Sequence, residues 1–253
     1  MINQTAYSLG ANRSVIRDLF EYGCQRAAIV GRENVYDYSL GNPSIPSPKE
    51  VNETICAILG DTDSLAVHGY TSAVGDFDTR KAISDDLNAR YNAGTKPEEF
   101  FIGCGAAPEL VAVFHALSVP DGEVVAIAPY FPEYKPFVEG SGMKLKVVPP
   151  DESSFQIDFD ALSKAITYNT QAIIINSPNN PTGHVMTREE LEAIAKVAVE
   201  LDLLVISDEV YNTLIFEDAE VVSISTLPGM RDRTIIVNSF SKSYAMCGWR
   251  VGY

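Results

Sequence analysis

The segment from Ala172 to Tyr211 reads AIIINSPNNPTGHVMTREELEAIAKVAVELDLLVISDEVY, and it decides the class of fold. It begins with the apolar run Ala172–Asn176 and passes through a loop rich in proline and asparagine. Thr187 followed by Glu190 predicts a capping box at the start of a helix. The apolar residues of this helix share one face: Leu191, Ile194, Ala195 and Ala198. A second apolar run follows, so strand, helix and strand alternate, as in an α/β domain.

The same alternation extends over most of the chain. The predicted strands are Phe100–Ile102, Val124–Ala128, Leu145–Val148, Ala172–Asn176, Leu203–Ser207, Ile235–Asn238 and Trp249–Gly252. The predicted helices are Pro48–Leu59, Asp76–Tyr91, Ala107–Leu117, Asp158–Ile166 and Thr187–Leu201. Most strands are continuously apolar, which favours burial on both faces and a mainly parallel sheet. We therefore predict an α/β three-layer sandwich around a roughly seven-stranded central sheet.

Composition narrows the class of protein. The chain has 253 residues, of which 46% are hydrophobic, so it is long enough for a large core. Its formal net charge is −15, which disfavours nucleic acid and anionic membranes as partners. We see neither a signal peptide nor an apolar run long enough to span a membrane, so the expected location is the cytoplasm. The four cysteines lack metal-ligand spacing, so we expect reduced thiols and no metal site.

Ligands of parallel sheets gather at the carboxyl ends of the strands, so the polar groups that follow the apolar runs are candidates. After Ile102 the chain turns through glycines into a helix, where the amides of Gly105, Ala106 and Ala107 can face an anion. An ordinary strand–helix turn is the alternative. The aromatic run that contains Phe131 follows the Val124–Ala128 strand, and it predicts either a stacking surface for a flat cofactor or simply core.

Two further groups follow the next two strands. The loop 176–183 holds two prolines and a glycine, and Asn180 offers both a donor and an acceptor. It is either a functional loop or a plain turn. Asp208 ends a strongly apolar strand, where a carboxylate needs a partner such as a protonated ring nitrogen or a local helix cap. Tyr211 follows closely enough to face the same ligand.

The last group lies between Asn238 and Gly252. Lys242 sits between a strand end and a short turn, where loss of water lowers the pKa of a lysine and frees its amine for attack on a carbonyl. Arg250 can hold a phosphate with two hydrogen bonds, and Ser239 can donate to the same oxygens. A lone lysine is usually a surface residue, but the order of all five groups favours a single site.

Taken together, four motifs resemble the pyridoxal-phosphate-dependent aminotransferases of class I/II, with the fold-type I architecture of aspartate aminotransferase. They are Asn-Asn-Pro-Thr-Gly, Asp-Glu-Val-Tyr, Ser-Phe-Ser-Lys and Gly-Trp-Arg-Val-Gly. The resemblance runs from about Tyr38 to Tyr253. It implies pyridoxal 5′-phosphate as cofactor and transfer of an amino group from an amino acid to a 2-oxo acid through an internal aldimine at Lys242. It also implies a homodimer.

The resemblance assigns roles around the cofactor ring. Lys242 would also move the proton between the substrate α-carbon and the cofactor. Asp208 would keep the pyridine nitrogen protonated, and Tyr211 and Asn180 would bond the phenolic oxygen. Phe131 would stack on the ring. Within the family the peptide bond that follows Asn180 is often cis.

Other roles concern the phosphate and the substrate. The amides of Ala106 and Ala107 would bind the phosphate together with Ser239 and Arg250, although relatives often carry a hydroxyl or longer polar residue in this loop. Tyr70 would reach the phosphate of the neighbouring subunit. Two residues are implied as substrate contacts: Gly41 and Asn180.

The resemblance also suggests how the chain is divided. Residues 1–48 would form an N-terminal arm and part of a small domain, and residues 49–253 the large cofactor-binding domain. In the arm, Val15, Leu19 and Phe20 predict one helical stripe that breaks near Gly23. Relatives continue into a C-terminal segment that builds most of the small domain and supplies an arginine for the substrate carboxylate, so we expect a truncated chain. Alternatives are a C–S lyase that uses the same cofactor and a non-catalytic fragment, including a ligand-sensing module.

Overall fold

The computed structural model describes residues 2–11, 15–151, 156–216 and 218–253, and four residues of the predicted arm, 1 and 12–14, lie outside it. The chain divides into two compact units, Met1–Pro46 and Ser47–Tyr253, which are described separately.

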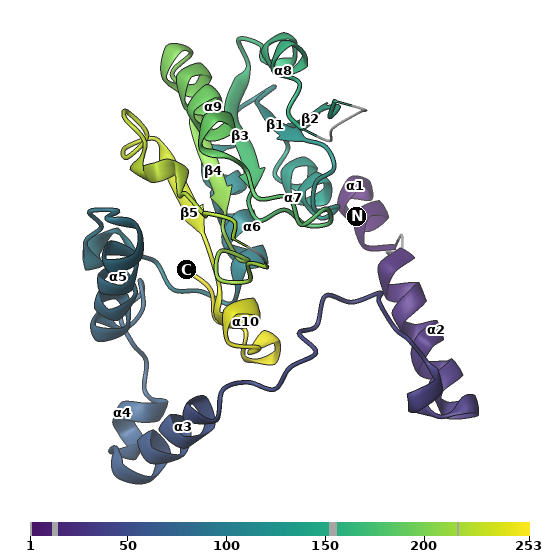
Figure 1. Cartoon of the computed structure of the whole chain (residues 1–253), viewed down its shortest axis with the longest axis vertical. Coiled ribbons are helices and arrows are strands. Elements are labelled where there is room, and N and C mark those ends of the chain that lie inside the picture. Colours follow the sequence, from purple (N-terminus) through teal and green to yellow (C-terminus); the bar gives the residue numbers. More distant parts are fainter. Residues whose placement is uncertain (1, 12–14, 152–155, 217) are drawn as a thin grey trace. The chain divides into compact units, whose positions relative to one another are not determined.

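A parallel sheet forms the centre of the second unit (Figure 1). Its strands are β1 Glu123–Ile127, β2 Lys144–Val148, β3 Thr170–Asn176, β4 Leu204–Asp208 and β5 Thr234–Val237. Their order is β2-β1-β3-β4-β5, and every neighbouring pair is parallel. The register pairs Asn176 with Asp208 and Asp208 with Val237, so three strands end at the same edge.

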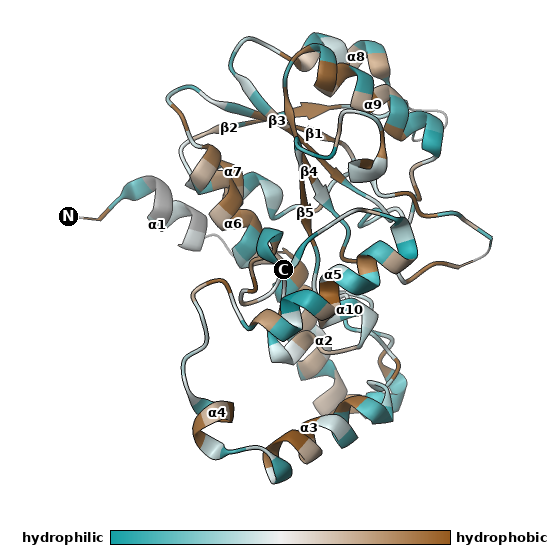
Figure 2. Ribbon diagram, turned by 90° about the vertical axis from the view of Figure 1, so that its left-hand side faces the viewer, coloured by the Kyte–Doolittle hydropathy of each residue, from teal (hydrophilic) through white to brown (hydrophobic). Residues whose placement is uncertain are grey.

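Helices cover both faces of this sheet (Figure 2). On β3, Ile173 and Ile175 pack into a core cluster with α8 Phe159–Ala165 and α9 Arg188–Glu200. Ala172 and Ile174 face the opposite cluster, which contains residues of α6 Ala106–Leu117 and α7 Tyr134–Gly140. Since alternate residues of a strand point to opposite faces, one apolar run supplies both clusters. The predicted three-layer α/β fold is confirmed.

The long predicted helices form within a few residues of their expected bounds. The helices of this unit that precede α6 are α3 Lys49–Asp61, α4 Ser64–His68 and α5 Phe77–Tyr91. The capping box of α9 is present: the Thr187 hydroxyl accepts from the Glu190 amide, and the Glu190 carboxylate accepts from the Thr187 amide. No helix in the described ranges combines the length and the apolar character that a membrane crossing requires.

The sheet has five strands among the described residues rather than the expected seven. Phe100–Ile102 is not a strand, and the residue that follows it, Gly103, makes an isolated bridge to Gly252. Trp249–Gly252 is not a strand because Cys247–Trp249 is a 3₁₀ turn and Arg250 is left-handed, with φ 55°. These two predictions of strands are therefore wrong.

In the first unit, α1 spans Gln4–Ala11 and α2 spans Val15–Val30. The predicted break near Gly23 is wrong, because α2 continues through it. Gly23 is buried, and a Cβ atom there would lie 3.3 Å from the Asp37 carboxylate. This glycine therefore permits a close approach within the unit rather than ending the helix.

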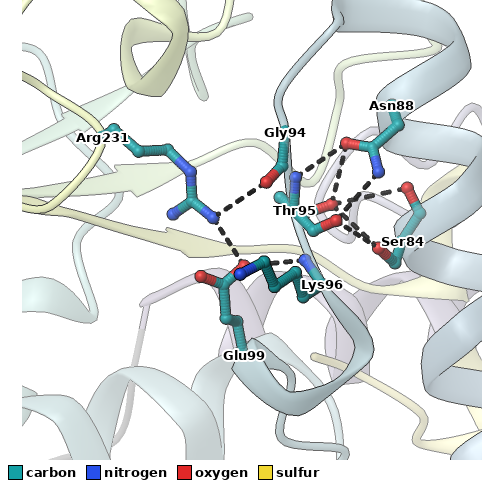
Figure 3. A network of polar contacts seen from close by, with 7 residues as sticks. All are labelled: Ser84, Asn88, Gly94, Thr95, Lys96, Glu99 and Arg231. Carbon is teal, nitrogen blue, oxygen red and sulfur yellow. Dashed lines mark hydrogen bonds and ion pairs between the residues drawn. The ribbon is translucent and has the colours of Figure 1, made fainter.

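A polar network fixes the segment that leads to the Phe100–Gly105 turn (Figure 3). Thr95 is bonded to Ser84 and Asn88 of α5; for example, its amide donates to the Asn88 side chain at 2.8 Å. Arg231, which precedes β5, donates to the Gly94 carbonyl at 3.3 Å and to Glu99 at 2.5 Å. These bonds tie the approach to the turn both to α5 and to the start of β5.

Candidate active site

The carboxyl edge of the sheet carries the candidate site. Asn176 ends β3, Asp208 ends β4, and Ser239 follows β5 closely. Lys242 lies in the short helix α10 Phe240–Ser243, directly beyond this edge (Figure 1). The parallel register therefore gathers polar groups that are far apart in the sequence, as the sequence predicts.

Asp208 is the most strongly perturbed member of this group. It is 5% exposed, and its Oδ2 atom accepts a hydrogen bond from the Tyr134 hydroxyl at 2.6 Å. Its Oδ1 atom accepts from the Val210 amide at 3.3 Å. Burial raises the pKa of Asp208 from its ordinary 3.8 to about 6, against the lowering effect of these two bonds. A cation placed beside it would favour the ionised form.

The loop after β3 is attached to the end of β4. The Asn176 side chain donates to the Asp208 carbonyl at 2.9 Å and accepts from the Asn180 amide at 2.6 Å. The Asn180 side chain then reaches the Tyr211 hydroxyl at 3.5 Å. The peptide bond between Asn180 and Pro181 is cis, as the resemblance implied.

Tyr211 links this loop to the lysine. The Lys242 ammonium nitrogen lies 5.8 Å from the centre of the Tyr211 ring. Burial raises the pKa of the Tyr211 phenol, and the charge of Asp208 raises it further, whereas the bond from Asn180 lowers it. Asp208, Asn180, Tyr211 and Lys242 therefore form one connected group.

A second group surrounds the first turn of α6. Gly105 caps this helix with φ 99°, a conformation that favours glycine, and the first-turn amides of Ala106 and Ala107 have no partners within a helix ladder. The Arg250 guanidinium crowds the same turn, since a Cβ atom on Gly105 would lie 2.4 Å from its Nη2 atom. Arg250 also donates to the Cys247 carbonyl at 3.0 Å. A guanidinium at the positive end of a helix dipole predicts an anion site.

Gly252 makes this arrangement possible. A Cβ atom there would lie 2.5 Å from the carbonyl carbon of Gly105 and 2.7 Å from the amide nitrogen of Ala106. Gly252 also bridges both Gly103 and Ser239, so the segment after Arg250 lies between the α6 turn and the end of β5. Ser239 is 3% exposed at this junction. The predicted phosphate ligands Ser239, Arg250 and the α6 turn are thus brought together.

The roles of two other predicted residues stay predictions. Gly41 belongs to the unit Met1–Pro46, so its proposed substrate contact stays a prediction. Tyr70 has a fully exposed side chain, and its role toward a neighbouring subunit also stays a prediction. Phe131 does lie near the group, because its ring packs edge-on against Tyr134 with centroids 5.6 Å apart.

Tyr134 is the contact that sequence reasoning missed. It lies in the aromatic run after β1, but α7 has only seven residues and offers little periodicity to read. A tyrosine on the buried face of a short helix needs a polar partner for its hydroxyl, and this signal could have identified it.

A cavity of about 260 Å³ lies elsewhere, along the edge of β5 that does not face β4. None of the predicted site residues lines it. It is bordered by β5 itself and by Phe100, Phe101, Arg231 and Tyr253, together with neighbouring side chains. This cavity therefore does not coincide with the candidate site.

Comparison with known proteins agrees with the motifs. Residues 32–253 match the family described as aminotransferase class I and II. The chain is 38% identical over 245 residues to an aspartate aminotransferase of Pyrococcus abyssi, and 34% identical over 244 residues to aromatic-amino-acid aminotransferase 2 of Thermococcus litoralis. Each match covers 96% of this chain and 60% of the relative, so the chain spans about three fifths of these relatives.

A solved structure agrees in the same way. The crystal structure of an amino transferase from Eubacterium rectale superposes with a TM-score of 0.93 at 45% identity. The match covers all of this chain and 65% of that one.

Proposed function

The chain belongs to the class I and II aminotransferases, and from that premise we propose that the protein moves an amino group from an amino acid to a 2-oxo acid with pyridoxal 5′-phosphate as cofactor. The observation that carries this proposal is the connected group of Asp208, Asn180, Tyr211 and Lys242 at the carboxyl edge of the sheet. Each member of the group supplies a different part of what such a cofactor needs.

The α6 turn suits the phosphate of the cofactor. The amides of Ala106 and Ala107 and the dipole of a twelve-residue helix favour an anion, and Arg250 supplies a full positive charge beside them. Because Gly252 has no side chain, its backbone can lie against the backbone of Gly105 and Ala106 at this turn. On a chain of net charge −15, these donors concentrate positive potential in one place.

The Asp208 end suits the ring. When bound, the cofactor supplies an electron sink that stabilises negative charge at the substrate α-carbon. Asp208 would hold a proton on the ring nitrogen, and its burial strengthens that ion pair because little water competes. Phe131 would cover the ring, and Asn180 and Tyr211 would donate to its phenolic oxygen.

Lys242 would hold the cofactor covalently and then move a proton at the substrate α-carbon. It lies in α10 beyond β5, with its side-chain nitrogen 5.8 Å from the centre of the Tyr211 ring. Gly41 and Asn180 are proposed as substrate contacts. A homodimer with Tyr70 at the partner's phosphate, and a cytoplasmic location, are also proposals; free cysteines among the described residues are compatible with a reducing compartment.

The test is a single-turnover reaction. The protein is loaded with pyridoxal 5′-phosphate, mixed with one amino acid at a time, and examined for pyridoxamine 5′-phosphate and the matching 2-oxo acid. We expect both products in equal amounts for at least one amino acid. Release of ammonia and pyruvate without the pyridoxamine form would contradict transamination and indicate β-elimination instead.

A further inference from the structure

Tyr134 is a buried side chain whose hydroxyl donates to Asp208. It is 1% exposed, and the distance from its hydroxyl to the Asp208 Oδ2 atom is 2.6 Å. Its ring stacks on Tyr130 at a centroid distance of 6.3 Å and meets the edge of Phe131 at 5.6 Å. Because the ring is held by packing, the direction of its hydroxyl is fixed by the fold and not by the ligand.

The Asp208 carboxylate is thereby held at both oxygen atoms. Oδ2 accepts from Tyr134, and Oδ1 accepts from the Val210 amide. The backbone of Asp208 is held as well, since its carbonyl accepts from the Asn176 side chain. Each carboxylate oxygen has two lone pairs, so both retain the capacity to accept from a further donor.

We propose that Tyr134 is a positioning residue, which keeps Asp208 ionised and turned toward the ring nitrogen of the cofactor. The proposal rests on the proposed function, because it assigns Asp208 to that nitrogen. A phenol that donates to a carboxylate stabilises the charged form of the acid. The proton that the ring nitrogen needs then stays on the ring and not on Asp208.

Two acidic groups and two hydrogen-bond donors act on Asp208 among the described residues. Among the described residues, Tyr211 and Glu209 interact electrostatically with Asp208, and both are acidic. Neither favours a negative charge on Asp208. The hydrogen bonds that lower its pKa come from Tyr134 and from the Val210 amide, and only the first comes from a side chain.

Tyr134→Phe is the informative variant, since it keeps the buried ring and removes the hydroxyl. A larger truncation would enlarge a small cavity of about 30 Å³ that Tyr134 lines, and water could then replace the phenol. Tyr130→Phe is the matched control, because it removes a hydroxyl from the stacked neighbour. Fluorinated tyrosine at position 134 is a second variant that keeps the hydroxyl and makes it a stronger donor.

The first readout needs no cofactor. The titration of Asp208 in the protein without cofactor is followed by carboxyl-carbon NMR. We expect its pKa to rise by about one unit in Tyr134→Phe, to fall with fluorinated tyrosine, and to stay unchanged in Tyr130→Phe. An unchanged Asp208 pKa in both position-134 variants would overturn the proposal.

The second readout is the affinity for pyridoxal 5′-phosphate, measured by titration at about pH 7.5. We expect Tyr134→Phe to weaken it by about tenfold in the wild-type background and by less than about twofold in an Asp208→Asn background. An equal loss in both backgrounds would mean that Tyr134 acts through packing, which also overturns the proposal. If the wild-type protein binds no cofactor, the proposed function fails, and the NMR titration alone still decides whether Tyr134 controls the carboxylate.

Discussion

Glu209→Gln tests whether burial at the end of a strand raises the pKa of a carboxyl group. Glu209 follows Asp208 and is 4% exposed. Its Oε1 atom accepts from the hydroxyl groups of Ser207 at 3.1 Å and Ser223 at 2.7 Å, whereas its Oε2 atom is buried without a hydrogen-bond partner. Burial raises the pKa of Glu209 from its ordinary 4.5 to about 7.

The magnitude follows from the two pKa values. A carboxyl group with a raised pKa in the folded state contributes stability that is present below pH 4.5 and is lost as the pH rises through 7. The difference of roughly 2.5 units corresponds to about 3 kcal/mol at 1.36 kcal/mol per unit. Glutamine does not ionise, but its amide leaves buried donors unsatisfied at a cost of about 1 kcal/mol. At about pH 8.5 the variant should therefore be more stable than wild type by about 2 kcal/mol.

Urea denaturation at about pH 5 and about pH 8.5 measures the effect. We expect the free energy of unfolding of Glu209→Gln, relative to wild type, to increase by about 2–3 kcal/mol between these two conditions. Glu192→Gln is the control, because it removes the same charge from an exposed position of α9. It should show no comparable change. A difference between Glu209→Gln and wild type that is the same at both pH values would refute the reasoning.

Three further substitutions test the anion site and the core. Gly252→Ala should weaken binding of pyridoxal 5′-phosphate by about tenfold or more in a cofactor titration, because its Cβ atom would collide with the α6 turn. Gly60→Ala is the control, since a Cβ atom there has nothing within 4 Å, and it should not change the affinity. Equal affinities of the two variants would contradict a phosphate site at the α6 turn. Arg250→Ala should weaken the same binding by about tenfold to a hundredfold, and Arg250→Lys should restore only part of it. Unchanged affinity in Arg250→Ala would mean that the guanidinium makes no phosphate contact. Ile194→Ala should lower the free energy of unfolding by about 3 kcal/mol in urea, since Ile194 is fully buried; a loss below about 1 kcal/mol would mean that the core is packed differently.

Capping residues and apolar patterns predict the elements correctly where the pattern in the sequence is strong. The capping box and apolar face of α9 predict that helix within a residue of its bounds, and the continuously apolar runs predict all five strands. The order of polar groups along the chain also predicts the gathering of Asp208, Tyr211 and Lys242, because parallel strands end at one edge.

Two of the failures depend on contacts that the local sequence does not show, and one depends on a local backbone conformation. Trp249–Gly252 has the composition of a strand, but the left-handed Arg250 interrupts it. Gly23 reads as a helix breaker, yet its missing side chain admits Asp37. The need of the buried Tyr134 for a polar partner can be read from the sequence, but the partner itself cannot, because Asp208 lies 74 residues further along the chain.

Lys242 is the residue on which the account depends most directly. The chain is incubated with pyridoxal 5′-phosphate, reduced with borohydride, digested and analysed by mass spectrometry. The account predicts one cofactor-labelled peptide, which contains Lys242, and no label at that peptide in Lys242→Ala. A label that settles on other lysines, or wild-type protein that carries none at Lys242, would contradict it.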